Sequence, residues 1–165
     1  MDKKIIEKKG INSVSEYICN CGYLEDHLNS NDKTLLWDGT ISVYRNKDEL
    51  TIDNFRYDVK CQVKASEWGR NYFPKSTSYE IKLRDLHKYL LDGGVIFFKS
   101  LVARNKQSQV YCAVLTKLSL SNILASPKGK KYAKLELLPI PTYTEFLQQI
   151  ESLHLQATHT LITPE

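Results

Sequence analysis

VIFFKSLVA, residues 95–103, is the stretch that decides the fold. A nearly continuous apolar run of this length is typical of a central strand that is buried on both faces of a sheet. The segment before it, RDLHKYLLDGG (84–94), has helical periodicity and ends at Gly93. After it come RNKQSQ (104–109), a hairpin turn, and VYCAVLT (110–116), the partner strand. A helix, a buried strand and a returning strand in succession predict an α/β sheet.

The rest of the chain extends this pattern on both sides. LLWDGTISVYR (35–45) alternates with a period of two, and NKD (46–48) separates it from the strand-like ELTIDNFRYDVKCQVKAS (49–66), so we expect two or three antiparallel strands there. The remaining expected elements are a helix at 11–21, a loop at 25–34, an irregular loop at 67–78, a strand at 78–83, a short helix at 117–125, a strand at 132–140 and an amphipathic helix at 142–155. The fold class is therefore α/β, with a central mixed β-sheet flanked by helices.

Length and composition predict one ordinary globular domain. The 165 residues suffice for a single core, which we place at about 10–155 within a domain of 1–165. Apolar residues make up 42% and charged residues 25% of the chain, and no apolar run approaches the roughly 18 residues of a membrane span. The first ten residues, MDKKIIEKKG, are too charged for a signal peptide. We therefore expect a cytoplasmic protein that does not enter membranes.

The cysteine and histidine spacings do not favour a structural metal site. The close cysteine pair is C-x-C rather than C-x-x-C, and the four histidines add no ligand spacing. Reduced, mostly buried thiols are the better interpretation of Cys19, Cys21, Cys61 and Cys112.

The net charge of +4 does not by itself indicate nucleic-acid binding, but the basic residues are clustered. One group, in SPKGKKYAKLE, fits either a phosphate contact or a solvated basic turn: Lys128, Lys130, Lys131 and Lys134. A second group surrounds the strand segment KCQVKAS: Lys60, Lys64, Arg70 and Lys75.

The segment KCQVKAS (60–66) carries the residues with the clearest chemical logic. In a strand, Gln62 and Lys64 project from the same face, and Asp38 lies beside them if its strand pairs with theirs. A carboxylate and an amide carbonyl are oxygen ligands of the kind that Mg²⁺ prefers. A lysine can orient an attacking water and stabilise the charge that develops on a phosphate. This set is the minimum for metal-assisted phosphodiester hydrolysis.

An Asp-Gly pair at a strand start, followed in a later strand by an apolar residue and Gln-x-Lys-Ala, resembles the PD-(D/E)XK nuclease superfamily. The closest likeness is to the Mrr-type branch, in which Gln replaces the acidic residue, and it covers about residues 10–125. The resemblance implies a restriction-endonuclease-like core and a Mg²⁺ or Mn²⁺ cofactor. It makes Asp38 the principal metal ligand, Gln62 the second ligand and Lys64 the catalytic lysine. The Val63 backbone oxygen and Glu16, on the first helix, would be further ligands.

Each of these assignments has an alternative in which the residue has an ordinary structural role. Asp-Gly is a common turn pair, and Glu16 lies away from the apolar stripe of its helix, as a solvated side chain would. Asp58-Val59-Lys60 also fits D-x-K, but we favour Gln62-Lys64 because Ala65-Ser66 follows it, and Lys60 then becomes a phosphate contact. The nearby loop could meet DNA through Trp68, Arg70 and Lys75, or could pack its own aromatic residues.

The first functional expectation is a metal-dependent endonuclease that cuts DNA and leaves a 5′-phosphate and a 3′-hydroxyl. The second is a nuclease-fold module that no longer cuts and serves in nucleic-acid binding or protein assembly, because Gln62 weakens the metal site. A third is an α/β interaction protein with an accidental motif. Two sites in a homodimer would cut both strands of a duplex more easily. The likeness extends to nuclease-like N-terminal domains of bacterial defence proteins, which implies a role in antiphage defence and a sensor or effector region, or partner protein, beyond this chain.

Overall fold

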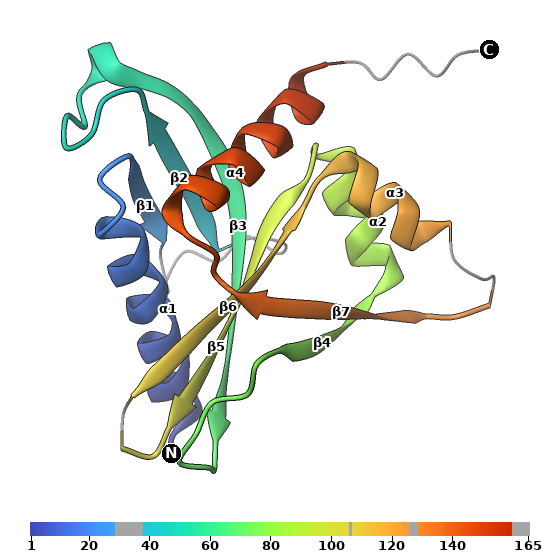
Figure 1. Cartoon of the computed structure of the whole chain (residues 1–165). Helices are drawn as coiled ribbons and strands as arrows, with labels where there is room; N and C mark the ends of the chain where they lie inside the picture. Colours follow the sequence, from blue (N-terminus) through green and yellow to red (C-terminus); the bar gives the residue numbers. More distant parts are fainter. Residues whose placement is uncertain (29–37, 106, 126–128, 160–165) are drawn as a thin grey trace.

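The computed structural model describes residues 1–28, 38–105, 107–125 and 129–159. This part of the chain forms a seven-stranded mixed sheet with four α-helices packed on it (Figure 1). In chain order the elements are α1 (Lys3–Cys19), β1 (Leu24–Leu28), β2 (Gly39–Tyr44), the 3₁₀ turn η1 (Ile52–Asn54), β3 (Phe55–Trp68), β4 (Thr77–Lys82), α2 (Leu83–Leu91), β5 (Val95–Ala103), β6 (Ser108–Leu115), α3 (Lys117–Leu124), β7 (Tyr132–Pro139) and α4 (Tyr143–Thr158). The predicted α/β class is confirmed, and the architecture is compatible with a restriction-endonuclease-like core.

Strand order in the sheet is β1-β2-β3-β5-β6-β7-β4. β2 and β3 are antiparallel, as the period-two pattern predicted, and β1 is antiparallel to β2. β3 and β5 are parallel, and α2 lies in the crossover that parallel strands require. β5 is buried along its length except at Lys99, which confirms the interpretation of VIFFKSLVA as the central strand. β6 returns antiparallel to β5.

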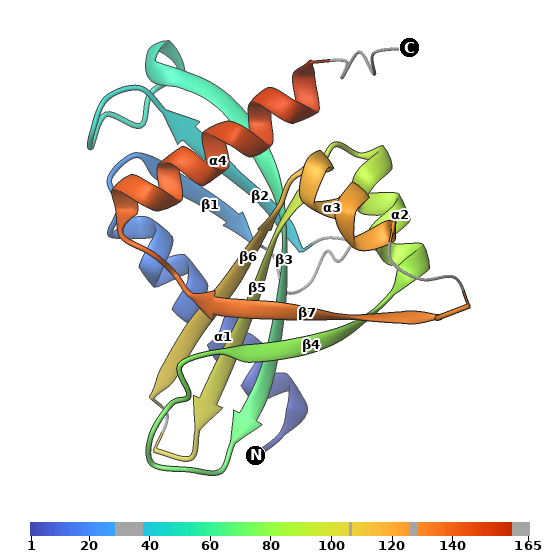
Figure 2. The ribbon, with the colours of Figure 1, turned by 45° about the vertical axis from the view of Figure 1, so that its right-hand side comes forward.

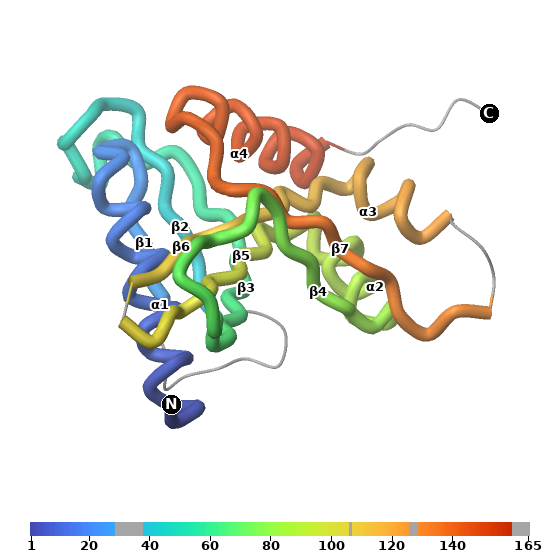
Figure 3. Tube along the Cα trace, turned by 60° about the horizontal axis from the view of Figure 1, so that its bottom comes forward, coloured from blue at the N-terminus to red at the C-terminus, as the bar shows by residue number. Residues whose placement is uncertain are grey.

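The sheet separates two apolar cores. One core lies between the sheet and the helices α1 and α4, and contains Val14, Cys61, Val63 and Phe146. The other lies on the opposite face with α2 and α3, and Phe97 is buried within it. Figure 3 shows α1 at one side of the molecule and α2 and α3 at the other. Side chains that alternate along β3 therefore face different helices.

The β4–β7 ribbon crosses the other strands instead of continuing the sheet smoothly (Figure 2). The two strands pair antiparallel along their length, from Thr77↔Leu137 to Lys82↔Tyr132. β7 joins the main sheet only through Tyr111↔Pro139 and Cys112↔Leu138. This short junction leaves β4 and β7 in front of β3 and β5, where they form one wall of the candidate site.

Two predicted boundaries were wrong. The expected loop at 25–34 contains a strand, β1, whose polar sequence LEDHL is held by pairing with β2 and by the buried Leu24. Residues 29–37 of that region, Trp37 included, lie outside the described residues. The first helix begins at Lys3, capped by Asp2, rather than at residue 11. Gly10 lies inside this helix, where α1 packs closely on β3. A larger residue would not fit, since a Cβ there would be 2.5 Å from the Ala65 Cβ.

Three of the four cysteines are buried and all four are free, as expected from their spacing. Glu151 on α4 fastens that helix to β3, because its carboxylate accepts hydrogen bonds from Arg56 Nη2 (2.9 Å) and Tyr57 Oη (2.7 Å). Among the described helices, none combines the length and the apolar character needed to cross a membrane.

Candidate active site

Asp38 lies directly before β2 and is fixed against β3. Its backbone N–H donates to the Cys61 carbonyl (3.0 Å), and its Oδ2 accepts a hydrogen bond from the Val63 N–H (2.7 Å). The residue is only 5% exposed. The glycine that follows is required by packing, since a Cβ on Gly39 would collide with the carbonyl oxygen of His27 in β1. The Asp-Gly pair is therefore a strand start that holds a carboxylate against the middle of β3.

Gln62 and Lys64 face the side of the sheet that carries α2. Their neighbours Cys61 and Val63 enter the core under α1, so the alternation of β3 sends the other two side chains the opposite way. The register Gly39↔Cys61 places Asp38 across from Gln62. Gln62 is 8% exposed, and its side-chain amide has no hydrogen-bond partner among the described residues. No side-chain nitrogen or oxygen atom in the described part of the chain is both fully buried and without a hydrogen bond, so the Gln62 amide is open to the cavity, where it is available to a ligand.

A cavity of about 380 Å³ opens in front of Gln62 and Lys64. Its other walls come from β4, α2, β5 and β7: Tyr79, Glu80, Ile81, Lys82, Asp85, Tyr89, Phe97 and Tyr132. Sequence analysis treated the α2 segment as packing only and missed these contributions. Asp85 and Tyr89 are spaced i, i+4, which places them on one face of α2. That spacing was the one available signal for this wall of the cavity.

Two carboxylates in this region raise the pKa of the same tyrosine, Tyr89. Burial raises the pKa of Tyr89 far above its usual value, and the charges of Asp85 and, to a smaller extent, Asp38 raise it further. The pKa of Tyr79 is raised by burial and by Asp85. Asp85, which lines the cavity, and Asp38, which lies beside β3 and is not part of the lining, are thus both within electrostatic reach of Tyr89.

Lys99 on β5 is a cation that sequence analysis missed. It is the parallel-strand partner of Lys64, so the two side chains are neighbours on the same face. Its Nζ donates to the carbonyl oxygen of Ser78 (2.8 Å), and burial lowers the pKa of its ammonium group. The two adjacent lysines make this end of the cavity suited to an anion.

Lys60, two residues before Gln62, shares its face of β3. Its ammonium group lies 3.8 Å from the carboxylate of Asp92, at the end of α2. The rival pair Asp58-Lys60 is not part of the cavity lining. The Asp58 carboxylate instead accepts a hydrogen bond from Ser42, whose hydroxyl is also 2.9 Å from His27 Nε2. The geometry thus favours Gln62-Lys64 over the acidic register.

The loop residues predicted to contact DNA lie beyond Lys64, at the far end of β3. Trp68 is partly buried, and its indole N–H donates to the Tyr72 carbonyl (2.7 Å). The Arg70 guanidinium donates to the Tyr72 hydroxyl (2.8 Å), and Lys75 is exposed. Tyr72 itself is the exposed ring of this loop. The structure does not bring these side chains into the cavity.

Glu16 is separated from the other predicted ligands. It is exposed on α1 and lines a shallow groove with Ser108, Gln109 and Val110 of β6. Because α1 packs on the face opposite to Gln62 and Lys64, the structure does not bring Glu16 together with them.

The oxygen atoms near Gln62 fit a weakly bound cation that prefers oxygen ligands, such as Mg²⁺, better than a metal ion held entirely by protein ligands. In the described part of the chain, no group of three or more His, Cys, Asp or Glu side chains is arranged to hold a metal ion. Asp38, the Gln62 carbonyl and Asp85 offer oxygen atoms, and Mg²⁺ commonly takes only one or two protein carboxylates and completes its shell with water and phosphate. The Gln62 amide, which opens into the cavity from a mostly buried residue, is the observation that supports this fit.

Comparisons of this chain with protein families, with curated proteins and with solved structures found no match. Its function is therefore inferred from the residues around the cavity.

Proposed function

We propose that this chain is a Mg²⁺-dependent nuclease domain that hydrolyses phosphodiester bonds of DNA at the cavity between β3 and α2. The observation that carries the proposal is the placement of Gln62, a mostly buried residue whose amide opens into the cavity, across from Asp38 and on the same face as Lys64. The amide of Gln62, the lysine Lys64 and the carboxylate of Asp85 line one cavity, and each has a role in cleaving a phosphodiester.

Each side chain has a distinct part in this chemistry. Asp38 and Gln62 would hold Mg²⁺ through their oxygen atoms, with Asp85 as a second carboxylate from α2. Bound Mg²⁺ would polarise the phosphodiester and lower the pKa of an attacking water. Lys64 would donate hydrogen bonds to the phosphate oxygens and stabilise their growing negative charge. Lys99, its neighbour, would add to the positive potential that draws the DNA backbone in.

The test is a cleavage assay on plasmid and linear DNA with Mg²⁺, Mn²⁺ or EDTA. Asp38→Asn and Lys64→Ala should abolish metal-dependent cutting, while Lys8→Ala, an exposed change on α1, should not alter it. Asn keeps the size of Asp38, so circular dichroism should confirm that each variant is folded. Cutting that persists in both site variants would refute the proposed site.

A module that no longer cuts is the second candidate, and Gln62 is the observation that favours it. With one strand carboxylate replaced by an amide, Mg²⁺ affinity depends on Asp38 and Asp85. Titration calorimetry with Mg²⁺ and Mn²⁺ separates the two candidates. A nuclease should bind a divalent ion with an affinity that falls in Asp85→Asn, whereas an inert module should bind neither ion.

A further inference from the structure

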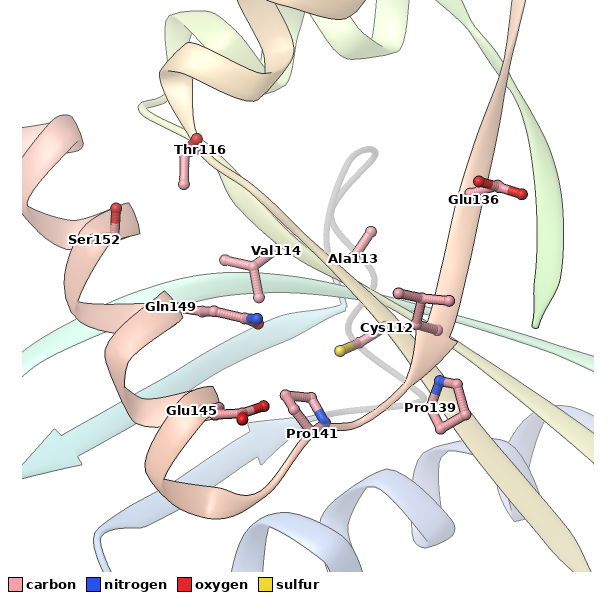
Figure 4. A pocket seen from close by; sticks show the side chains of 11 residues that line it. Cys112, Ala113, Val114, Thr116, Glu136, Pro139, Pro141, Glu145, Gln149 and Ser152 are labelled. Atoms are coloured by element: carbon pink, nitrogen blue, oxygen red, sulfur yellow. The ribbon is translucent and has the colours of Figure 1, made fainter. Parts of the chain in front are cut away.

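A second cavity, of about 490 Å³, lies between β6, β7 and α4 and shares no lining residue with the candidate active site (Figure 4). Its floor is the end of β6, and its sides are β7 and the helix α4. Figure 4 shows Gln149 and Glu145 extending from α4 toward Val114 and Cys112. This groove is independent of the proposed nuclease activity.

The floor of the groove is an open strand edge. β7 pairs with β6 only at Tyr111↔Pro139 and Cys112↔Leu138. Pro139 has no N–H to donate, so Cys112↔Leu138 must be the hydrogen-bonded pair. Val114, two residues on, then directs its own N–H and C=O toward the same edge. In the described part of the chain, the pairing of this edge ends at Cys112↔Leu138, and no turn or loop hydrogen bond involves the Val114 backbone.

The rim of the groove is acidic although the chain carries a net charge of +4. Glu136 on β7 and Glu145 on α4 are both exposed, and neither forms an ion pair with a described residue. The lining contains no lysine or arginine, while Leu138 beside it is 60% exposed. Two carboxylates repel nucleic acid and attract cationic side chains.

We propose that this groove binds an extended basic peptide segment of a partner protein, which adds a short strand to the β6 edge at Val114 and places lysine or arginine side chains against Glu136 and Glu145. Open strand edges are templates for such pairing, with backbone bonds supplying affinity and side-chain contacts supplying specificity. On the Val114 side of Cys112, β7 pairs no further than Leu138, because its residues 132–137 pair with β4 instead, and this leaves the β6 edge available.

The probe is a short synthetic peptide of alternating lysine and valine, measured by calorimetry or fluorescence anisotropy on the full chain. Glutamate-valine and alternately N-methylated lysine-valine peptides serve as controls. The lysine peptide should bind, and added salt should weaken it. Glu136→Gln with Glu145→Gln should weaken binding about threefold to tenfold. Glu49→Gln with Asp53→Asn makes the same charge change on the β2–β3 connection and should leave binding unchanged.

Three results would overturn the proposal. The glutamate peptide could bind as well as the lysine peptide, which removes the role of the carboxylates. The N-methylated peptide could bind equally, which removes strand pairing. The chain could form a concentration-dependent dimer that Glu136→Gln with Glu145→Gln disrupts, in which case the groove receives a second copy of this protein.

Discussion

Replacing Gln62 by glutamate should make the stability of this protein depend on divalent metal. Directly opposite residues on antiparallel strands have Cβ atoms about 5 Å apart, and the register places Asp38 across from Gln62. At that separation and an effective dielectric constant of about 20, two carboxylates repel by about 3 kcal/mol. Without metal, the new carboxyl must either ionise against this repulsion or remain protonated above its usual pKa. The free energy of unfolding of Gln62→Glu should therefore fall by about 2–3 kcal/mol in EDTA.

Mg²⁺ should reverse this loss, because the added carboxylate strengthens the site that the metal occupies. A metal concentration of about 100 times its dissociation constant stabilises the folded state by about 2.7 kcal/mol. Urea denaturation of the wild type, Gln62→Glu and Gln62→Met, each with EDTA and with Mg²⁺, measures the effect. Gln62→Met lacks both the oxygen and the charge, so its stability should be the least sensitive to Mg²⁺. An equal loss in Gln62→Glu with and without Mg²⁺ would refute the reasoning, since no cation would then lie between these side chains.

Three further changes test other parts of the structure. Gly39→Ala forces a Cβ against the β1 backbone and should lower the free energy of unfolding by about 1–3 kcal/mol. Gly69 has open space around it, so Gly69→Ala should be nearly neutral, and denaturant titration compares the two variants. The hydrogen bonds to Glu151 lower the pKa of its carboxyl group, and the one from the Tyr57 hydroxyl has the largest effect. The stability that Glu151 contributes is therefore complete above its usual pKa of 4.5 and is lost as the pH falls through the lowered value. Glu151→Gln should remove about 0.5–1 kcal/mol at pH 7 and flatten the acid limb of the stability curve. Lys75→Ala should reduce the salt slope of DNA binding by about 1, whereas Lys8→Ala on α1 should leave it unchanged; a reduction in both would assign the effect to net charge alone.

Local periodicity was enough to predict the central strand and the shared face of Gln62 and Lys64. The run at 95–103 specified the central strand, because only a strand covered on both faces needs so many consecutive apolar residues. The period of two along β3 specified that Gln62 and Lys64 share a face. Both inferences use only the geometry of a single element, which the sequence contains.

Features that depend on tertiary pairing were not predictable in this way. β1 has a loop-like sequence and exists as a strand because β2 lies beside it. The helical position of Glu16 showed that it points away from the apolar stripe of α1, but not which face of the sheet the helix covers. The contribution of Asp85 follows from the crossover geometry of α2. Nor does any local pattern indicate that β4 pairs with β7, since the two strands are joined through α2, β5, β6 and α3.

The groups around the cavity indicate which measurement separates a nuclease from an inert module. The Gln62 amide is open to the cavity, so a ligand that covers it must offer a hydrogen bond or a metal ion in place of solvent. Lys64 and Lys99 are like charges on neighbouring strands, which destabilises the folded state. Such a local conflict is expected where a ligand relieves it. An anion would relieve the lysine pair, and a cation or a hydrogen-bond donor would satisfy the amide. We therefore propose that a non-cutting module would also bind phosphate at this cavity. DNA affinity would then not separate the two candidates, whereas divalent-metal affinity at Asp38 and Gln62 would.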